Sequence, residues 1–265
     1  MDLFLQAVPI FLLVFCRITS FFVVAPIFST RGVPAMAKIG LGFFVSLMVF
    51  LAMGQEQMPA LNAEYLLVVI REILIGLLLG FVAYLFFTIV QTAGSFIDLQ
   101  MGFGMANVID PMTGVSTPML GNFKFILLIL IFLSMNGHHY LLMAIMQSYE
   151  WIPLGNELYA KISQGNISTF LVETFAYTFM LSLQMSAPLV VAMFLTDVGL
   201  GFLARTAPQF NVFVIGIPLK ILVGFLILAM LMPGMVALFG QIFEQMFRAM
   251  EQLLHLISAD SGGTT

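Results

Sequence analysis

Six long apolar stretches alternate along the chain with shorter polar segments and with segments rich in Gly and Pro. The stretches cover residues 3–28, 39–53, 65–90, 123–147, 170–195 and 212–239. At 1.5 Å per residue, the first, third and last would form helices of about 35–42 Å, enough to cross a hydrocarbon core of about 30 Å. Residues 39–53 would give only about 22 Å, so we expect one arm of a helical hairpin or a half-length helix.

Prolines and small residues modify these predicted helices. Pro188, Pro218 and Pro233 interrupt apolar runs, and each is expected to kink or break its helix because proline lacks a backbone donor. Gly76 and Gly80 form a small-xxx-small pattern, which allows a neighbouring helix to approach closely. The pattern therefore predicts long kinked helices and helical hairpins.

The last helical pattern in the chain differs from the others. Its apolar positions repeat at steps of three and four, at Phe243, Met246, Phe247, Met250, Leu253, Leu254 and Ile257, and polar residues fill the opposite face. This spacing predicts an amphipathic helix that packs on protein or lies at the membrane interface. Residues 258–265, SADSGGTT, are expected to form a flexible tail.

Composition sets the class of protein. Of the 265 residues, 61% are hydrophobic and 8% are charged, and the mean hydropathy is +1.09, whereas soluble domains contain roughly 25% charged residues. We therefore predict an all-α integral membrane protein. The net charge of −4 and the absence of a basic patch argue against nucleic acid as a partner.

Cys16 is the only cysteine, which excludes an internal disulfide.

Charged residues occur where lipid would disfavour them. Six ionisable residues lie within or beside the apolar stretches: Arg17, Arg71, Glu72, Glu173, Asp197 and Lys220. Each would cost about 2.5–3.5 kcal/mol at the centre of a lipid-facing helix. We predict buried charges that pair between helices of this chain or between subunits. Arg71 and Glu72 are adjacent and point in different directions, so we expect them to pair poorly and at least one to need another helix.

The sequence predicts neither a catalytic motif nor a metal site. His138 and His139 are adjacent, and Leu142 and Met143 stand where a helical metal site would need further ligands. The serines lack a nucleophile-elbow sequence, and the chain has no phosphate loop or dinucleotide fingerprint. We therefore expect no enzymatic activity, no catalytic residue, no metal and no cofactor.

One segment is neither a plausible long helix nor strongly polar. GMANVIDPMTGVSTPMLGN, residues 104–122, separates two very apolar stretches and contains three Gly, two Pro and three Met. Its prolines prevent a continuous helix, and its glycines permit turns. Methionine, 20 of 265 residues overall, has a flexible side chain that fits irregular or changing surfaces. The composition suits a deformable seal as well as a generic apolar loop.

Four stretches of the sequence identify a protein family more specifically than the composition does. They are FCRITSFFVVAPIFSTRGVPAMAKIGL (15–41), GSFIDLQMGFGMANVIDPMTG (94–114), NGHHYLLMAIMQSYEWIPLG (136–155) and ARTAPQFNVFVIGIPLKILVG (204–224). Together, in this order and in a chain of this length and hydropathy, they resemble the FliR/SctT family of export-gate subunits. The family serves flagella and injectisomes, and the quoted stretches favour the flagellar branch.

The resemblance implies a structural and gating subunit of the flagellar type III protein export gate. In this family, one FliR-like subunit joins several copies of FliP and FliQ in a right-handed helical assembly, which forms the channel for unfolded export substrates. The implied location is the bacterial inner membrane and the flagellar basal body, with part of the assembly above the bilayer plane. FlhB and FlhA are further implied partners, besides membrane lipid.

The same resemblance implies domains and sites. Residues 1–195 would be a FliP-like region of helical hairpins, and residues 196–257 a FliQ-like hairpin that ends in the amphipathic helix. Residues 104–122 would plug the pore, with Gly104, Met105, Asn107, Asp110, Pro111, Met112, Thr113, Gly114, Pro118 and Met119 as plug residues. Arg205, Pro208 and Gln209 would lie in a turn at 204–211 near the cytoplasmic entrance, unless that turn is a simple helix connection.

Two other functions are compatible with the hydropathy. A multi-spanning secondary transporter of a small solute would use broken helices and buried charges to build a midplane site. A membrane enzyme would depend on residues such as His138 or Asp110. Neither alternative accounts for the four stretches in their order.

Overall fold

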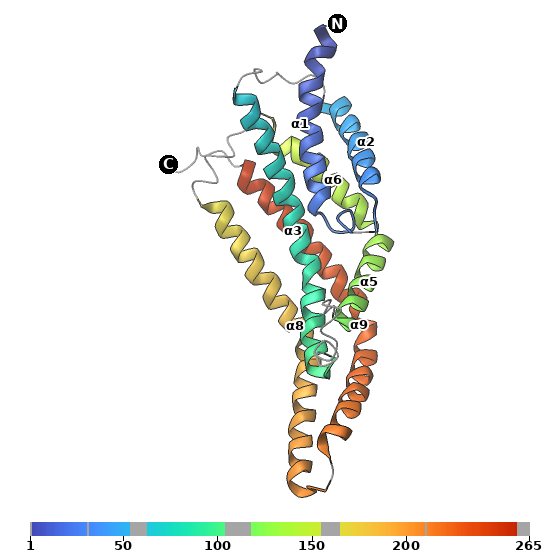
Figure 1. Cartoon of the computed structure of the whole chain (residues 1–265). Helices are drawn as coiled ribbons and strands as arrows, with labels where there is room; N and C mark the ends of the chain where they lie inside the picture. The colour runs from blue at the N-terminus through green and yellow to red at the C-terminus, as the bar shows by residue number, and fades with distance from the viewer. Residues whose placement is uncertain are drawn as a thin grey trace. The chain divides into compact units, whose positions relative to one another are not determined.

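Every regular element in the described part of the chain is an α-helix. The computed structural model describes residues 2–30, 32–53, 63–103, 118–154, 165–209 and 211–258. In chain order, the helices are α1 (Asp2–Val24), α2 (Ala35–Met53), α3 (Ala63–Met101), α5 (Met119–Ser134), α6 (Gly137–Trp151), α8 (Asn166–Thr206) and α9 (Val212–Ser258) (Figure 1). Within these described ranges, five helices are long and apolar enough to cross a membrane, and the bent pair α5–α6, at 71°, would make a sixth. The predicted all-α integral membrane protein is confirmed.

The chain divides into two compact units, each built from segments that are distant in sequence. The first contains Met1–Leu85, Asn136–Thr174 and Glu244–Thr265. The second contains Phe86–Met135 and Phe175–Phe243. Helices α3, α8 and α9 therefore contribute one part to each unit.

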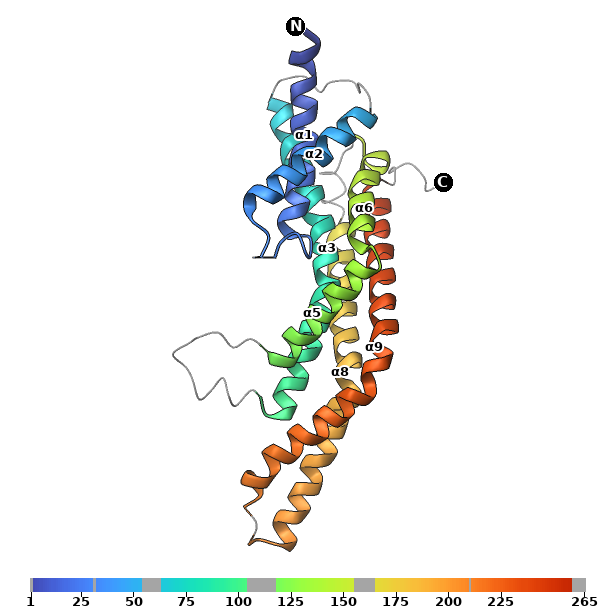
Figure 2. The same cartoon turned by 90° about the vertical axis from the view of Figure 1, so that its right-hand side faces the viewer.

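In the first unit, α1 and α2 form an antiparallel hairpin (Figures 1 and 2). The Phe11 ring lies 5.4 Å from the ring of Phe43 and 6.1 Å from that of Phe50, and Gly42 lies beside Thr19. The expected hairpin arm is thus present. Its expected length was wrong, because α2 has 19 residues and is about 28 Å long.

Helix α1 also packs closely on α3. A Cβ atom on Gly76 would collide with the hydroxyl of Ser20 and the carbonyl oxygen of Arg17, and one on Gly80 would lie 3.0 Å from the carbonyl oxygen of Phe21. The close approach predicted from the small-xxx-small pattern is confirmed. Glycine at these positions lets the two backbones meet with no side chain between them.

The prolines do not break the two longest helices. Helix α8 has 41 residues and continues through Pro188, and α9 has 47 residues and continues through Pro218 and Pro233. A break was among the expected outcomes, and it does not occur. Only one helical hydrogen bond is lost at each proline, and neighbouring groups can compensate for that loss within a membrane helix.

The amphipathic pattern at the end of the chain is confirmed, but it belongs to α9 and is not a separate helix. Met246, Met250, Leu253 and Ile257 are buried, whereas the charged residues on the opposite face are exposed. A single helix can therefore change from an apolar span to an amphipathic segment with no change in its backbone.

In the second unit, α8 and α9 form a hairpin, visible in both views (Figures 1 and 2). Helix α8 ends at Thr206 and α9 begins at Val212, which places the connection within the segment 204–211. Next to this connection, Leu200 of α8 packs against Gly216 of α9. Phe87, Phe132 and Phe243 form another contact of this unit, with ring centroids 4.8–6.0 Å apart.

We predict that Gly76→Ala destabilises the protein, because the new methyl group would meet the backbone of α1. Overpacking of this kind lowers the free energy of unfolding by about 1–3 kcal/mol. The matched control is Gly40→Ala in α2, where no atom lies within 4 Å of the added Cβ; its stability should be unchanged or slightly raised. Thermal unfolding in detergent would test this, and equal melting temperatures for the two variants would contradict it.

Candidate functional site

A cluster of buried charges lies in the first unit. Arg17 of α1 donates from Nε to Glu72 Oε2 at 2.6 Å and from Nη2 to Oε1 at 3.0 Å. Arg71 donates from Nη2 to the same carboxylate at 2.6 Å. The side chains of Arg17 and Glu72 have no exposed surface, and that of Arg71 is 3% exposed. One carboxylate of α3 therefore holds two guanidinium groups away from solvent.

Helix α6 and the residue that follows it accept hydrogen bonds from the remaining donors of Arg17. Nη1 donates to the carbonyl and hydroxyl oxygens of Ser148, each at 3.1 Å, and Nη2 donates to the carbonyl oxygen of Ile152 at 3.0 Å. The Tyr149 ring lies 3.9 Å from the guanidinium carbon, and the Tyr149 hydroxyl donates to the carbonyl oxygen of Val14. The cluster thus joins α1, α3 and α6, and its charges are paired and hydrogen-bonded as burial requires.

The predicted charges have different environments. Arg17 with Glu72 confirms that one of the adjacent charges finds a partner on another helix, but Arg71 and Glu72 also pair directly, which was not expected. The long arginine side chain can bend back to reach its neighbour. Lys220 and Asp197 form an inter-helix pair at 2.8 Å, with side chains 17% and 45% exposed. Glu173 is exposed on α8, so its pairing with another subunit stays a prediction.

A second polar site lies in the second unit, where α3 meets the start of α5. The carboxylate of Asp98 accepts hydrogen bonds from the backbone N–H of Leu120, at 3.1 and 3.2 Å, and from that of Gly121, at 3.5 Å. Pro118, the residue before α5, makes no side-chain cap. Helix N-termini leave N–H groups without partners, and here a side chain of another helix binds two of them. We call this arrangement the Asp98 cap.

Close packing supports the Asp98 cap. A Cβ atom on Gly94 would overlap Gly121, so α3 and α5 touch through their backbones. Met101 and Leu120, near the two ends of the segment 104–117, are buried in one apolar cluster with Ile97, Leu189, Met193 and Leu228. The chain therefore leaves this cluster after α3 and returns to it at α5.

Most predicted plug residues lie outside the described residues: Gly104, Met105, Asn107, Asp110, Pro111, Met112, Thr113 and Gly114. Pro118 directly precedes α5, and Met119 is its first residue, 68% exposed. Residues 104–122 were expected to form no continuous helix. In the described part of this segment, α5 begins directly after Pro118, where the Asp98 cap binds the N–H groups of its first turn. Arg205, Pro208 and Gln209 are exposed at the α8–α9 connection.

The sequence analysis missed Asp98 and Lys124. Both are buried, at 5% and 2% exposure, and their charges attract each other. Lys124 lies inside the apolar stretch 123–147 and already met the criterion used for the other charges. Asp98 lies eight residues beyond the stretch 65–90, which is a little more than two helical turns. Among the described residues, no group of three His, Cys, Asp or Glu side chains is arranged to hold a metal ion.

These features define an integral membrane protein of apolar helices with paired internal charges. Its sequence matches the model of the bacterial export proteins, family 1, over residues 8–246. The chain belongs to this family, the FliR/SctT family. It is therefore a membrane component of a bacterial flagellar or type III export apparatus, and the family is not a known enzyme family.

Three relatives illustrate the match. The flagellar biosynthetic protein FliR of Bacillus subtilis (strain 168) is 40% identical over 97% of this chain and 99% of its own length. FliR of Escherichia coli (strain K12) is 32% identical over 90% of each chain. The Yop proteins translocation protein T of Yersinia pestis is 31% identical over 86% of this chain and 87% of its own.

We predict that Glu72→Gln strongly destabilises the protein. The change keeps the size of the side chain but removes the negative charge that two buried guanidinium groups share. Breaking a buried ion pair from one side costs about 3–5 kcal/mol. The control, Glu173→Gln at an exposed position, should change stability by less than about 0.5 kcal/mol. Thermal unfolding in detergent would measure both, and similar values for the two variants would rule out this role of the charge cluster.

We predict that Asp98→Ala frees the start of α5. Leu120 and Gly121 would lose their hydrogen-bond acceptor, at a cost of about 1–3 kcal/mol. Hydrogen exchange followed by mass spectrometry should show faster exchange in peptides that cover these two amides. Ser95→Ala, one turn earlier on α3 and exposed, is the control. Unchanged protection in Asp98→Ala would mean that packing alone holds the helix end.

Proposed function

We propose that this chain is a structural and gating subunit of the flagellar type III export gate. In this proposal, it forms with FliP and FliQ the channel through which unfolded flagellar proteins leave the cytoplasm. Residues 104–122 close that channel and move aside for a substrate. The last four of these residues, 119–122, form the first turn of α5.

The observation that carries the proposal is how the described residues before and after 104–117 are held. The Asp98 cap fixes the start of α5, and Gly94 with Gly121 brings α3 and α5 into backbone contact. A plug needs fixed attachment points so that it returns to the same place after each passage. The Met, Val and Thr side chains of residues 104–117 would exclude ions from a pore without binding strongly to passing chains.

The assembly is the second part of the proposal. We infer one copy of this chain with several copies of FliP and FliQ in the bacterial inner membrane, at the base of the flagellum, partly above the bilayer plane. Residues 1–195 would take the place of a FliP-like subunit and residues 196–257 that of a FliQ-like subunit. FlhB and FlhA would contact the complex, and exposed Arg205, Pro208 and Gln209 would face its cytoplasmic entrance.

We predict that replacing residues 104–117 by a short Gly/Ser linker makes the gate leak ions. The complex with FliP and FliQ would be reconstituted in planar bilayers, and its conductance would rise well above the wild-type level. The control carries the same linker in place of residues 54–62. Conductance equal to the wild type in both would refute the plug.

Native mass spectrometry of the same preparations separates assembly from gating. A complex with one copy of this chain must be seen for the wild type and both linker variants before conductances are compared. A stable chain that ignores FliP and FliQ, and transports a small solute alone in proteoliposomes, would instead favour a secondary transporter.

A further inference from the structure

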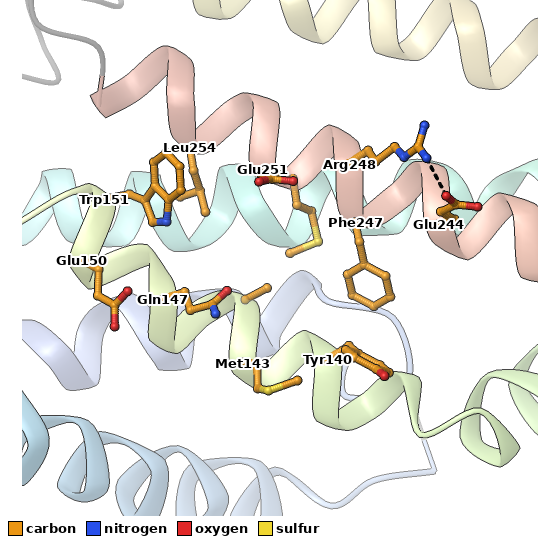
Figure 3. Close-up of a pocket in the computed structure, with 12 residues that line it drawn as sticks. Tyr140, Met143, Gln147, Glu150, Trp151, Glu244, Phe247, Arg248, Glu251 and Leu254 are labelled. Atoms are coloured by element: carbon orange, nitrogen blue, oxygen red, sulfur yellow. Dashed lines mark hydrogen bonds and ion pairs between the residues drawn. The ribbon is translucent and has the colours of Figure 1, made fainter.

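A groove runs between α6 and the C-terminal part of α9 in the first unit. It has a volume of about 720 Å³, and we define it by Tyr140, Gln147 and Trp151 of α6 and Phe247, Glu251 and Leu254 of α9 (Figure 3). Its lining on α6 extends from Tyr140 to Trp151, which corresponds to about 17 Å along a helix. The α6–α9 groove is therefore as long as three turns of a helix.

The inner wall of the groove is apolar and aromatic. Leu254 is buried and Phe247 half-buried, and the rings of Tyr140 and Phe247 lie 5.7 Å apart. The Trp151 ring is fixed edge-on against His255, with ring centroids 4.0 Å apart. Aromatic side chains held in this way are typical anchors in the centre of protein interfaces.

The rim of the groove is acidic. It carries the carboxylates of Glu150, Glu244 and Glu251 and one guanidinium, that of Arg248, which is already paired with Glu244 at 2.6 Å (Figure 3). Within the described ranges, Glu150 and Glu251 form no ion pair with another residue of the chain. The rim thus carries two exposed carboxylates, one on each helix, that have no counter-ion within the described ranges.

We propose that the α6–α9 groove docks a helix of another export-apparatus subunit that carries Lys or Arg. The proposal rests on the proposed function, because it requires this chain to work in a hetero-oligomer. Lipid fits poorly, since carboxylates repel anionic headgroups and are costly beside acyl chains. A helix laid along the groove would place apolar residues on the aromatic wall and basic side chains beside the rim carboxylates, Glu251 on α9 and Glu150 on α6.

A photocrosslinking experiment tests this pairing. Met143, which lines the groove and is 46% exposed, would be replaced by benzoylphenylalanine in the full chain co-expressed with tagged FliP and FliQ. We expect a crosslink to a peptide of a partner subunit that contains Lys or Arg. A crosslink to lipid, to residues 155–164 of this chain with Lys161, or to no protein would overturn the proposal.

Charge reversal provides the second arm. Glu150→Lys with Glu251→Lys should lower the crosslink yield about tenfold or more, whereas Gln252→Lys, exposed on α9 and outside the groove, should leave it unchanged. Reversing the crosslinked basic residue of the partner to Glu should restore the yield. An unchanged yield in the double variant would refute the charge pairing. Native mass spectrometry of the wild type distinguishes this failure from absence of the assembly, which would refute the proposed function itself.

Discussion

The burial of Arg17 is the constraint on which the first unit depends. A guanidinium with no exposed surface is tolerated only when a counter-charge and further acceptors surround it. Glu72 of α3 supplies the charge, and the carbonyl oxygens of Ser148 in α6 and of Ile152, the residue after α6, supply the acceptors. A shift of any one of these three helices along its axis would therefore break the hydrogen bonds and the ion pair of Arg17. Apolar packing alone would allow many registers, and this cluster selects one.

The second unit applies the same requirement to the backbone. A helix that begins amid apolar surroundings has N–H groups that water cannot reach. Asp98 binds two of them, and the contact of Gly94 with Gly121 lets its short side chain come near enough. In both units, a polar group of α3 fixes another helix. Helix α3 is one continuous helix, and it supplies the acceptor in both cases.

The sequence was informative wherever one stretch of chain decides the outcome. Apolar runs located most of the helices, and Gly76 and Gly80 indicated a close approach, because hydropathy and side-chain size are local properties. The exception is the run 123–147, which the structure divides into α5 and α6 with a bend of 71°. Continuity through Pro218 and Pro233 was not predictable, since it depends on the groups around each proline. Poor pairing of Arg71 with Glu72 was predicted from the directions of adjacent side chains on an ideal helix. That argument ignores the length of the arginine side chain, which reaches its neighbour. The Asp98 cap needs α3 and α5 together, so no single stretch of sequence could reveal it.

Helix α8 shows why the chain suits an assembly. On one face, Thr178, Ser182 and Ser186 are buried, and each hydroxyl donates to a carbonyl oxygen of its own helix. Side chains that are small and already hydrogen-bonded within their own helix allow a neighbouring helix to pack closely. In a membrane this close packing matters because the hydrophobic effect does not drive helices together. Large apolar side chains such as Phe175 and Phe194 are exposed on α8, at 58% and 61%. Exposure of so much apolar surface to water is unfavourable, so lipid or neighbouring subunits of the export apparatus must cover it.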